Sequence, residues 1–178
     1  MGEPRRFRKK YENPFKPWDR DLLMQELILI GEYGLKNKRE LRRMNTFLRK
    51  IRDVARSTFG LPPEEREHVS RELLGRLYKL GILPEDATVE DVLKLTVRDI
   101  LERRLQTIVF KKGLAKSIYH SRQMIVHGHI MIGDRIVDRP SYLVTRDEEE
   151  LVRISPRSPY ADPDHPIWKS EVKVEGEQ

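Results

Sequence analysis

The side chains with the clearest chemistry lie between Arg103 and Ile154, and that chemistry is binding rather than bond-making. Four of them recur at helical spacing and would share one helix face: Lys116, His120, Gln123 and His127. Each can donate a hydrogen bond to a phosphate oxygen. The opposite face carries a stripe that can pack into a core, formed by Leu114, Ile118, Ser121 and Ile125. The segment therefore predicts a helix that binds phosphates on one side.

Other chemistries fit these residues less well. Residues 113–117 end like the loop that cradles phosphates in nucleotide-binding enzymes, but Phe110 and Ala115 stand where that motif needs glycine. His127 and His129 lack a third nearby ligand, so they make a poor zinc site. No spacing of serine, histidine and aspartate favours a catalytic triad. We therefore expect no catalysis, no cofactor and no metal.

A β-hairpin after the helix would place more cations beside it. Gly128 can end the helix in the left-handed conformation, and Gly133-Asp134 suits a two-residue type II′ turn. The register then pairs Ile130 with Val137, Met131 with Ile136 and His129 with Asp138. Further RNA-binding candidates flank the helix and the hairpin: Arg104, Lys111, Lys112, Arg122, His129, Arg135, Arg139, Ser141 and Tyr142.

A second basic region lies near the N-terminus. Residues 1–18 form a basic arm with too little apolar surface to fold alone, so we expect it to order on its partner. Its cations are Arg5, Arg6, Arg8, Lys9 and Lys10. Its aromatic side chains could stack on bases or pack on protein, and we favour packing for Phe7, Tyr11, Phe15 and Trp18.

The helix that Asn37 can cap, which reaches about Ser57, carries more positive charge than solubility requires. Its candidates for RNA contact are Arg39, Arg42, Arg43, Arg49, Arg52 and Arg56. The alternative is that ion pairs occupy these arginines, as on an exposed helix of a thermophilic protein. Only Glu40 and Asp53 are near in sequence, so we favour RNA contact.

The remaining pattern predicts an α+β chain in four parts. These are the arm 1–18, a helical subdomain 19–95, a module 103–154 and a tail 155–178. The module would contain two short helices, a hairpin and a third strand at 151–154. Caps and apolar spacing predict helices over 19–33, 63–80, 89–95 and 97–102, and an acidic turn over 147–150. Four prolines predict an extended path for the tail, which we expect to wrap its own domain or a neighbouring protein.

Charge distribution limits the classes of partner. The 178 residues include 35 basic and 29 acidic side chains, a net charge of +6. Residues 1–58 carry a net +8, residues 96–139 a net +5 and residues 147–178 a net −5. Such blocks favour a polyanion such as nucleic acid. No apolar run could span a bilayer or make a secretory signal, and cysteine is absent, so we expect a cytoplasmic location.

Several motifs carry a family resemblance. Ser121-Arg122-Gln123, the run His127 to Ile130 and the run Arg139 to Tyr142 resemble the RNA-binding module of the small-subunit ribosomal protein four family. The N-terminal run Met1 to Tyr11, with Asn13-Pro14 and Pro17-Trp18, resembles the archaeal version of that family. The chain departs from many relatives by Gln106, where they have aspartate, and by Ile118, where an arginine is frequent.

This resemblance implies an alpha-L type RNA-binding module and a constituent of the small ribosomal subunit. It implies direct binding of small-subunit ribosomal RNA, a role in nucleating the subunit body, and an influence on translational accuracy beside the fifth small-subunit protein. Double-helical RNA hides its base edges in a deep groove, so a rigid basic surface would read its shape. Two alternatives stay open: an assembly factor resembling this protein, or an accessory part of an RNA-modifying enzyme.

Overall fold

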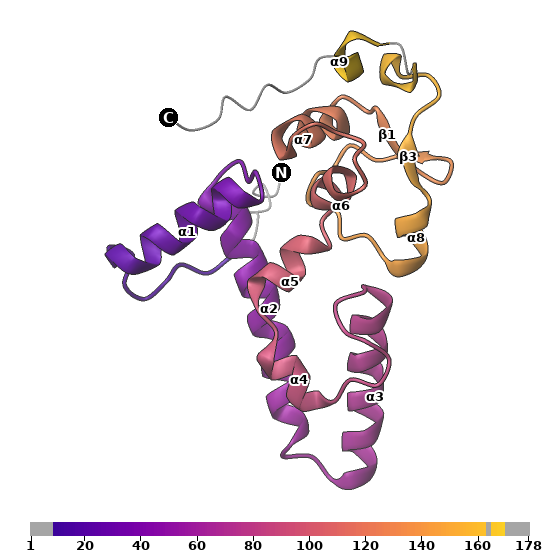
Figure 1. The fold of residues 1–178 in the computed structure, drawn as a ribbon. Helices are drawn as coiled ribbons and strands as arrows, with labels where there is room; N and C mark the ends of the chain where they lie inside the picture. The colour runs from indigo at the N-terminus through magenta and orange to yellow at the C-terminus, as the bar shows by residue number, and fades with distance from the viewer. Residues whose placement is uncertain (1–8, 163–164, 170–178) are drawn as a thin grey trace, which may run out of the picture.

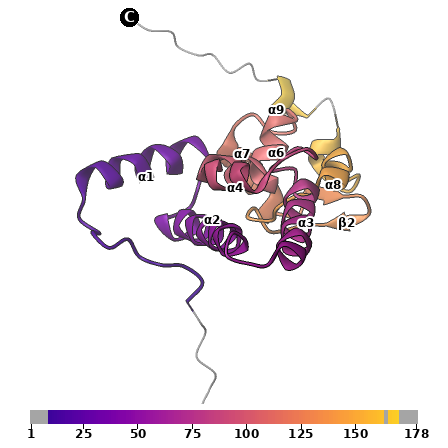
Figure 2. The ribbon, with the colours of Figure 1, turned by 90° about the horizontal axis from the view of Figure 1, so that it is seen from below.

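The computed structural model describes residues 9–162 and 165–169, and it divides into a helical part and a mixed part (Figure 1). The helical part contains α1 (Arg20–Glu32), α2 (Lys38–Thr58), α3 (Pro63–Lys79), α4 (Val89–Lys94) and α5 (Val97–Glu102). Helix α2 is its axis. Both views place α1 and α3 on opposite sides of α2 (Figures 1 and 2).

Local capping signals explain where these helices begin. The Asn37 side chain accepts a hydrogen bond from the backbone N–H of Glu40, three residues into α2. Thr88 and Thr96 each form a capping box with an aspartate three residues later, which starts α4 and α5. These caps confirm the helix starts predicted from the sequence.

The helical part has a core built along one face of α2. Leu48, Ile51 and Ala55 of α2 pack against Leu77 of α3, and the same cluster includes Val92 of α4. A smaller cluster joins Tyr33, Leu35, Leu41 and Leu101 between α1, α2 and α5. The apolar residues that recur at helical spacing along α2 therefore form its buried face.

The mixed part contains α6 (Leu105–Lys111), α7 (Ile118–Val126), β1 (Ile130–Ile132), β2 (Arg135–Ile136), α8 (Arg146–Glu150) and β3 (Val152–Ile154). The three strands form an antiparallel sheet in the order β2-β1-β3. Met131 pairs with Ile136, as the hairpin pattern predicted. Gly133 has a φ of 58° while no described non-glycine residue has positive φ, which fits the predicted type II′ turn.

The core of the mixed part lies between the helix pair and the sheet. It joins Leu105 and Val109 of α6, Met124 and Ile125 of α7, and Ile130 of β1, all of them fully buried. The predicted stripe on α7 is confirmed, because Ile118, Ser121 and Ile125 are buried. The helix itself begins later than predicted, at Ile118, because the Ser117 side chain caps it.

Two local predictions were wrong. The acidic segment near residue 147 is a one-turn helix, α8, because Thr145 and Glu148 form a capping box there. The tail does not follow an extended path throughout: it forms the 3-10 turn η1 (Pro159–Ala161) and the short helix α9 (Pro166–Lys169). No helix in the described ranges is long and apolar enough to cross a membrane.

Candidate nucleic-acid interface

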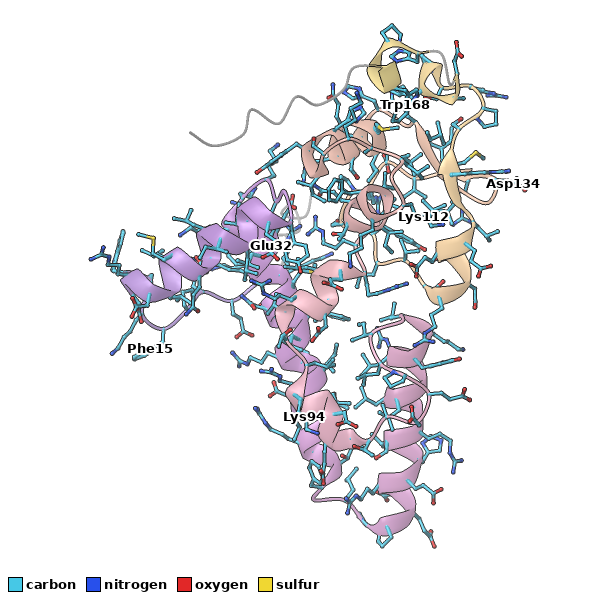
Figure 3. All side chains as sticks on the ribbon, in the orientation of Figure 1. Phe15, Glu32, Lys94, Lys112, Asp134 and Trp168 are labelled. Carbon is cyan, nitrogen blue, oxygen red and sulfur yellow. The ribbon has the colours of Figure 1, made fainter. Side chains whose placement is uncertain are left out.

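The hairpin presents two arginines to solvent beside a groove. Arg135 and Arg139 are exposed, and they line a hollow of about 860 Å³ together with Tyr142, Glu148 of α8 and Leu151 just after that helix. Asp134 marks the hairpin turn, which projects from the body of the molecule (Figure 3). Arg135 takes part in no ion pair within the described part of the chain, and Arg139 reaches only Asp138, at 4.0 Å. These two guanidinium groups are therefore available to phosphates.

One wall of this groove is fixed by Tyr142 and Glu148. The Tyr142 hydroxyl donates to the Glu148 carboxylate at 2.7 Å, and this hydrogen bond raises the pKa of Tyr142. Burial opposes ionisation of Glu148, but hydrogen bonds from Thr145 and Tyr142 outweigh it, so the pKa of Glu148 is lowered. Tyr142 thus holds the groove's shape through its hydroxyl, while the neighbouring Ser141 is exposed.

The two lysines at the end of α6 are exposed but already engaged. Lys111 pairs with Glu102 at 3.1 Å, and the Lys112 ammonium donates to the backbone carbonyl of Glu149. Exposed pairs of this kind contribute little to stability, so phosphate can compete for Lys111.

The prediction for Arg104 was wrong, because this side chain is fully buried and cannot reach RNA from the folded surface. Its guanidinium lies 2.9 Å from Glu40 of α2, a residue 64 positions away in the chain. Arg122 of α7 also pairs with Glu40, at 2.8 Å and 3.2 Å, and it is only about one-fifth exposed. Both arginines therefore join the two parts of the molecule, a role that the sequence did not reveal.

A buried amide completes this junction. The Gln106 side-chain amide donates to the backbone carbonyls of Gly34 and Ile118 at 2.9 Å and 3.0 Å, and the backbone carbonyl of Gln106 accepts from the Ser121 hydroxyl at 2.6 Å. Gly34, at φ 57°, has no room for a side chain, because an added Cβ would stand 2.8 Å from the Gln106 amide nitrogen. The departure from the family pattern at residue 106 was the only available signal for this contact.

Electrostatics at the junction favour the charged form of Glu40. Burial alone would raise the pKa of Glu40, but the hydrogen bonds from Arg122 and the charge of Arg104 outweigh burial and lower that pKa. We call Glu40, Arg104, Gln106 and Arg122 the junction cluster.

Only part of the predicted phosphate-binding face of α7 is open to solvent in the structure. Gln123 and His127 are exposed, as expected. His120 instead accepts a hydrogen bond from the backbone N–H of Lys116 at 3.3 Å, and its ring meets that of Tyr160 at 5.6 Å. The half-buried Lys116 side chain lies beside it at the N-terminal end of α7.

His129 also packs on the tail rather than opening to solvent. Its ring lies 4.8 Å from the Tyr160 ring and hydrogen-bonds the Ser158 hydroxyl at 3.0 Å. Burial lowers the pKa of both His120 and His129, and the nearby Lys116 and His127 charges act in the same direction. We call His120, His129, Ser158 and Tyr160 the histidine clasp. It shows that the described start of the tail packs on its own domain, one of the two expectations for the tail.

The described part of the N-terminal arm lies along α2. The Glu12 backbone N–H donates to the Thr46 hydroxyl at 3.0 Å, and Glu12 pairs with Arg49. The ring of Tyr11 lies beneath two cations, Lys9 at 4.7 Å and Arg39 at 5.8 Å. Residues 9–13 are thus held by the protein itself, and Lys10 is exposed beside them. Arg5, Arg6, Arg8 and Phe7 lie outside the described residues.

Ion pairs occupy more of the α2 arginines than the sequence suggested. Arg42 pairs with Glu26 at 3.4 Å, and Arg56 pairs with Asp53 at 3.2 Å. The Arg52 guanidinium donates to the Leu95 carbonyl. Arg43 is exposed and forms no ion pair with the residues that the structure describes. The ion-pair alternative therefore holds for part of this set.

A groove of about 510 Å³ nonetheless runs along α2 and the start of α5. It is lined by Asn45, Leu48, Arg49, Arg52, Arg56, Thr96 and Val97. Arg49 and Arg56 are more than half exposed, so their pairs with Asp53 can be exchanged for phosphate at little cost. Among the described residues no group of three or more side chains is arranged to hold a metal ion.

Comparison with known proteins agrees with this geometry. The S4 domain family matches residues 103–150, which include every residue that lines the hairpin groove except Leu151. A curated relative from Ignicoccus hospitalis, named small ribosomal subunit protein uS4, is 56% identical over 90% of this chain and 96% of its own length. Relatives of the same name from Hyperthermus butylicus and Sulfurisphaera tokodaii are 56% and 52% identical, over 90% of this chain and 92% and 91% of their own lengths. The chain belongs to the family of small ribosomal subunit protein uS4.

Proposed function

We propose that this chain is a structural constituent of the small ribosomal subunit that binds small-subunit ribosomal RNA directly. The observation that carries the proposal is the match to relatives of that name over nine-tenths of the chain. The exposed arginines of the hairpin groove supply the chemistry, because guanidinium groups bind phosphate through paired hydrogen bonds.

Two surfaces of the chain would contact the RNA. The first comprises the hairpin groove and the exposed Gln123, His127, Lys111 and Lys112 of the same module, at 103–154. The second is the α2 groove with Arg43 and the arm, within residues 1–95. Because the junction cluster fixes one part against the other, the pair of surfaces can select RNA by shape rather than by sequence.

The finer parts of the function follow from the same family. We expect the chain to nucleate assembly of the subunit body and to influence translational accuracy beside the fifth small-subunit protein, within cytoplasmic ribosomes. The mechanism needs no cofactor and no catalytic step. A rigid basic scaffold that folds two RNA segments toward each other is sufficient for such a role.

The test is binding of the purified chain to small-subunit ribosomal RNA across a range of salt concentrations. We expect tight binding. The logarithm of the association constant should fall linearly with the logarithm of the salt concentration, with a slope set by the number of phosphates that the protein neutralises. Mature, salt-washed small subunits should retain the protein. Its presence only in precursor particles would instead identify an assembly factor, and turnover on RNA would identify an enzyme.

A further inference from the structure

Two large aromatic side chains of the arm are almost completely open to solvent. Phe15 is 98% exposed and Trp18 is 89% exposed. Phe15 points away from the ribbon at the outer end of α1 (Figure 3). Aromatic side chains gain much from burial, so we expected both of them to pack on protein, yet neither packs on the described part of this chain. Their exposure within the described chain calls for a partner.

The backbone between them is held at both ends. The side chain of Asn13 accepts a hydrogen bond from Arg42 of α2 at 3.3 Å. On the other side, the Asp19 carboxylate caps α1 by accepting from the backbone N–H of Asp21 at 3.1 Å. Pro14 and Pro17 restrict φ in the short segment that remains. The two rings are therefore presented from a constrained loop.

The surrounding charge indicates what kind of partner fits. Lys16 lies between the two aromatics, and Arg20 follows Trp18; both cations are exposed. Of the nearby carboxylates, Glu12 pairs with Arg49 and Asp19 caps the helix, while Asp21 is exposed in the first turn of α1. Lysine is depleted in protein–protein interfaces, whereas aromatic rings among cations are the common design of single-stranded nucleic-acid sites.

We propose that Phe15 and Trp18 form a stacking platform for unpaired RNA bases, and that Lys16 and Arg20 hold the adjoining phosphates. This rests on the proposed function in that the natural ligand would be an unpaired segment of small-subunit ribosomal RNA. Ring faces stack on any base, so the platform would select unpaired over paired nucleotides rather than a sequence. Two residues lie between Phe15 and Trp18, so their Cα atoms are at most about 11 Å apart, which suits one or two neighbouring nucleotides.

Tryptophan fluorescence gives a direct readout, because the chain has only two tryptophans, Trp18 and Trp168. In a Trp168→Phe chain, Trp18 is the only tryptophan that emits. A ten-nucleotide oligoadenylate and small-subunit ribosomal RNA should both quench this emission, whereas a blunt RNA duplex should not. In the full-length chain, Phe15→Ala and Trp18→Ala should each lower affinity for the oligoadenylate about fivefold to hundredfold. Neither should change the melting temperature, since both side chains are exposed.

Phe59→Ala is the matched control, because Phe59 is a 43% exposed aromatic at the far end of α2, and its loss should leave RNA affinity unchanged. Unchanged Trp18 emission with saturating oligoadenylate would overturn the platform, even if ribosomal RNA still binds. Binding of oligoadenylate with quenching but no binding of ribosomal RNA would instead contradict the proposed function and keep the platform. Loss of a protein contact in the alanine variants, with RNA affinity intact, would assign these rings to a protein partner and overturn the platform.

Discussion

Glu40 holds two arginines of the module against the helical part, so Glu40→Gln tests whether the junction cluster joins the two parts. The substitution keeps the size of the side chain but removes its charge. Arg104 is left buried, with 0% of its side chain exposed, and without a counter-ion. Arg122 also loses the carboxylate that it contacts at 2.8 Å and 3.2 Å. The effect should therefore be large for a single atom replacement.

The magnitude follows from the burial of the three groups. Breaking a buried ion pair by removing one partner typically destabilises a protein by about 3–5 kcal/mol. Glu40 and Arg122 retain 16% and 22% exposure, so solvent screens part of the loss and we expect about 3 kcal/mol. For a chain of this size, that corresponds to a fall in melting temperature of about 6–12 °C. Thermal unfolding followed by circular dichroism measures it.

Glu32→Gln is the matched control. Glu32 pairs with Arg98 at 2.7 Å, but these side chains are 41% and 52% exposed, so the loss should stay below about 1 kcal/mol. The reasoning is refuted if both variants melt within about 2 °C of the wild type. Acid should act in the same direction: the pKa of Glu40 is lowered in the folded state, so its stabilisation is present above pH 4.5 and is lost as pH falls through the folded pKa.

Three further predictions test other features. Arg135→Gln should weaken binding of small-subunit ribosomal RNA and reduce the slope of log affinity against log salt by about one. The melting temperature should not change, because this side chain is exposed. An unchanged slope in binding titrations would contradict a phosphate contact. Because burial lowers the pKa of His120 and His129, the histidine clasp should stabilise the fold above pH 6.5 and lose this effect as pH falls through the lowered folded pKa values. Melting temperatures measured from pH 8 to pH 5 check this. A His129→Asn variant should show a weaker dependence of melting temperature on pH. Gly34→Ala should destabilise the fold by more than about 1 kcal/mol in denaturant titrations, because φ is positive and the new methyl group would meet Gln106; wild-type stability would show that the loop can shift.

The junction cluster also changes how variants of Arg122 should be interpreted. An Arg122→Gln, Arg135→Gln double variant would remove two of the candidates for RNA contact that the sequence identified. The structure shows Arg122 paired with Glu40, so the double variant would lose stability as well as phosphate contacts. Arg135 alone is the cleaner probe of the RNA surface.

Much of the secondary structure follows from signals that lie within a few residues of each other. Asn37 and Thr96 cap their helices through backbone groups three residues away, and Gly133 sets the turn of the hairpin through its own φ. The buried stripe of α7 follows from helical spacing alone. The tail was harder to predict, because prolines permit η1 and α9 as well as an extended chain.

The sequence by itself determined the basic character of the chain, its helix caps, the hairpin register and the family motifs, since each depends on residue type and short-range spacing. Only the tertiary structure decided which cations face solvent. Arg104 and Arg135 are chemically identical, yet one is buried against a carboxylate 64 positions away and the other is open. Accessibility is set by packing between distant segments, and no local pattern encodes which carboxylate will reach which guanidinium.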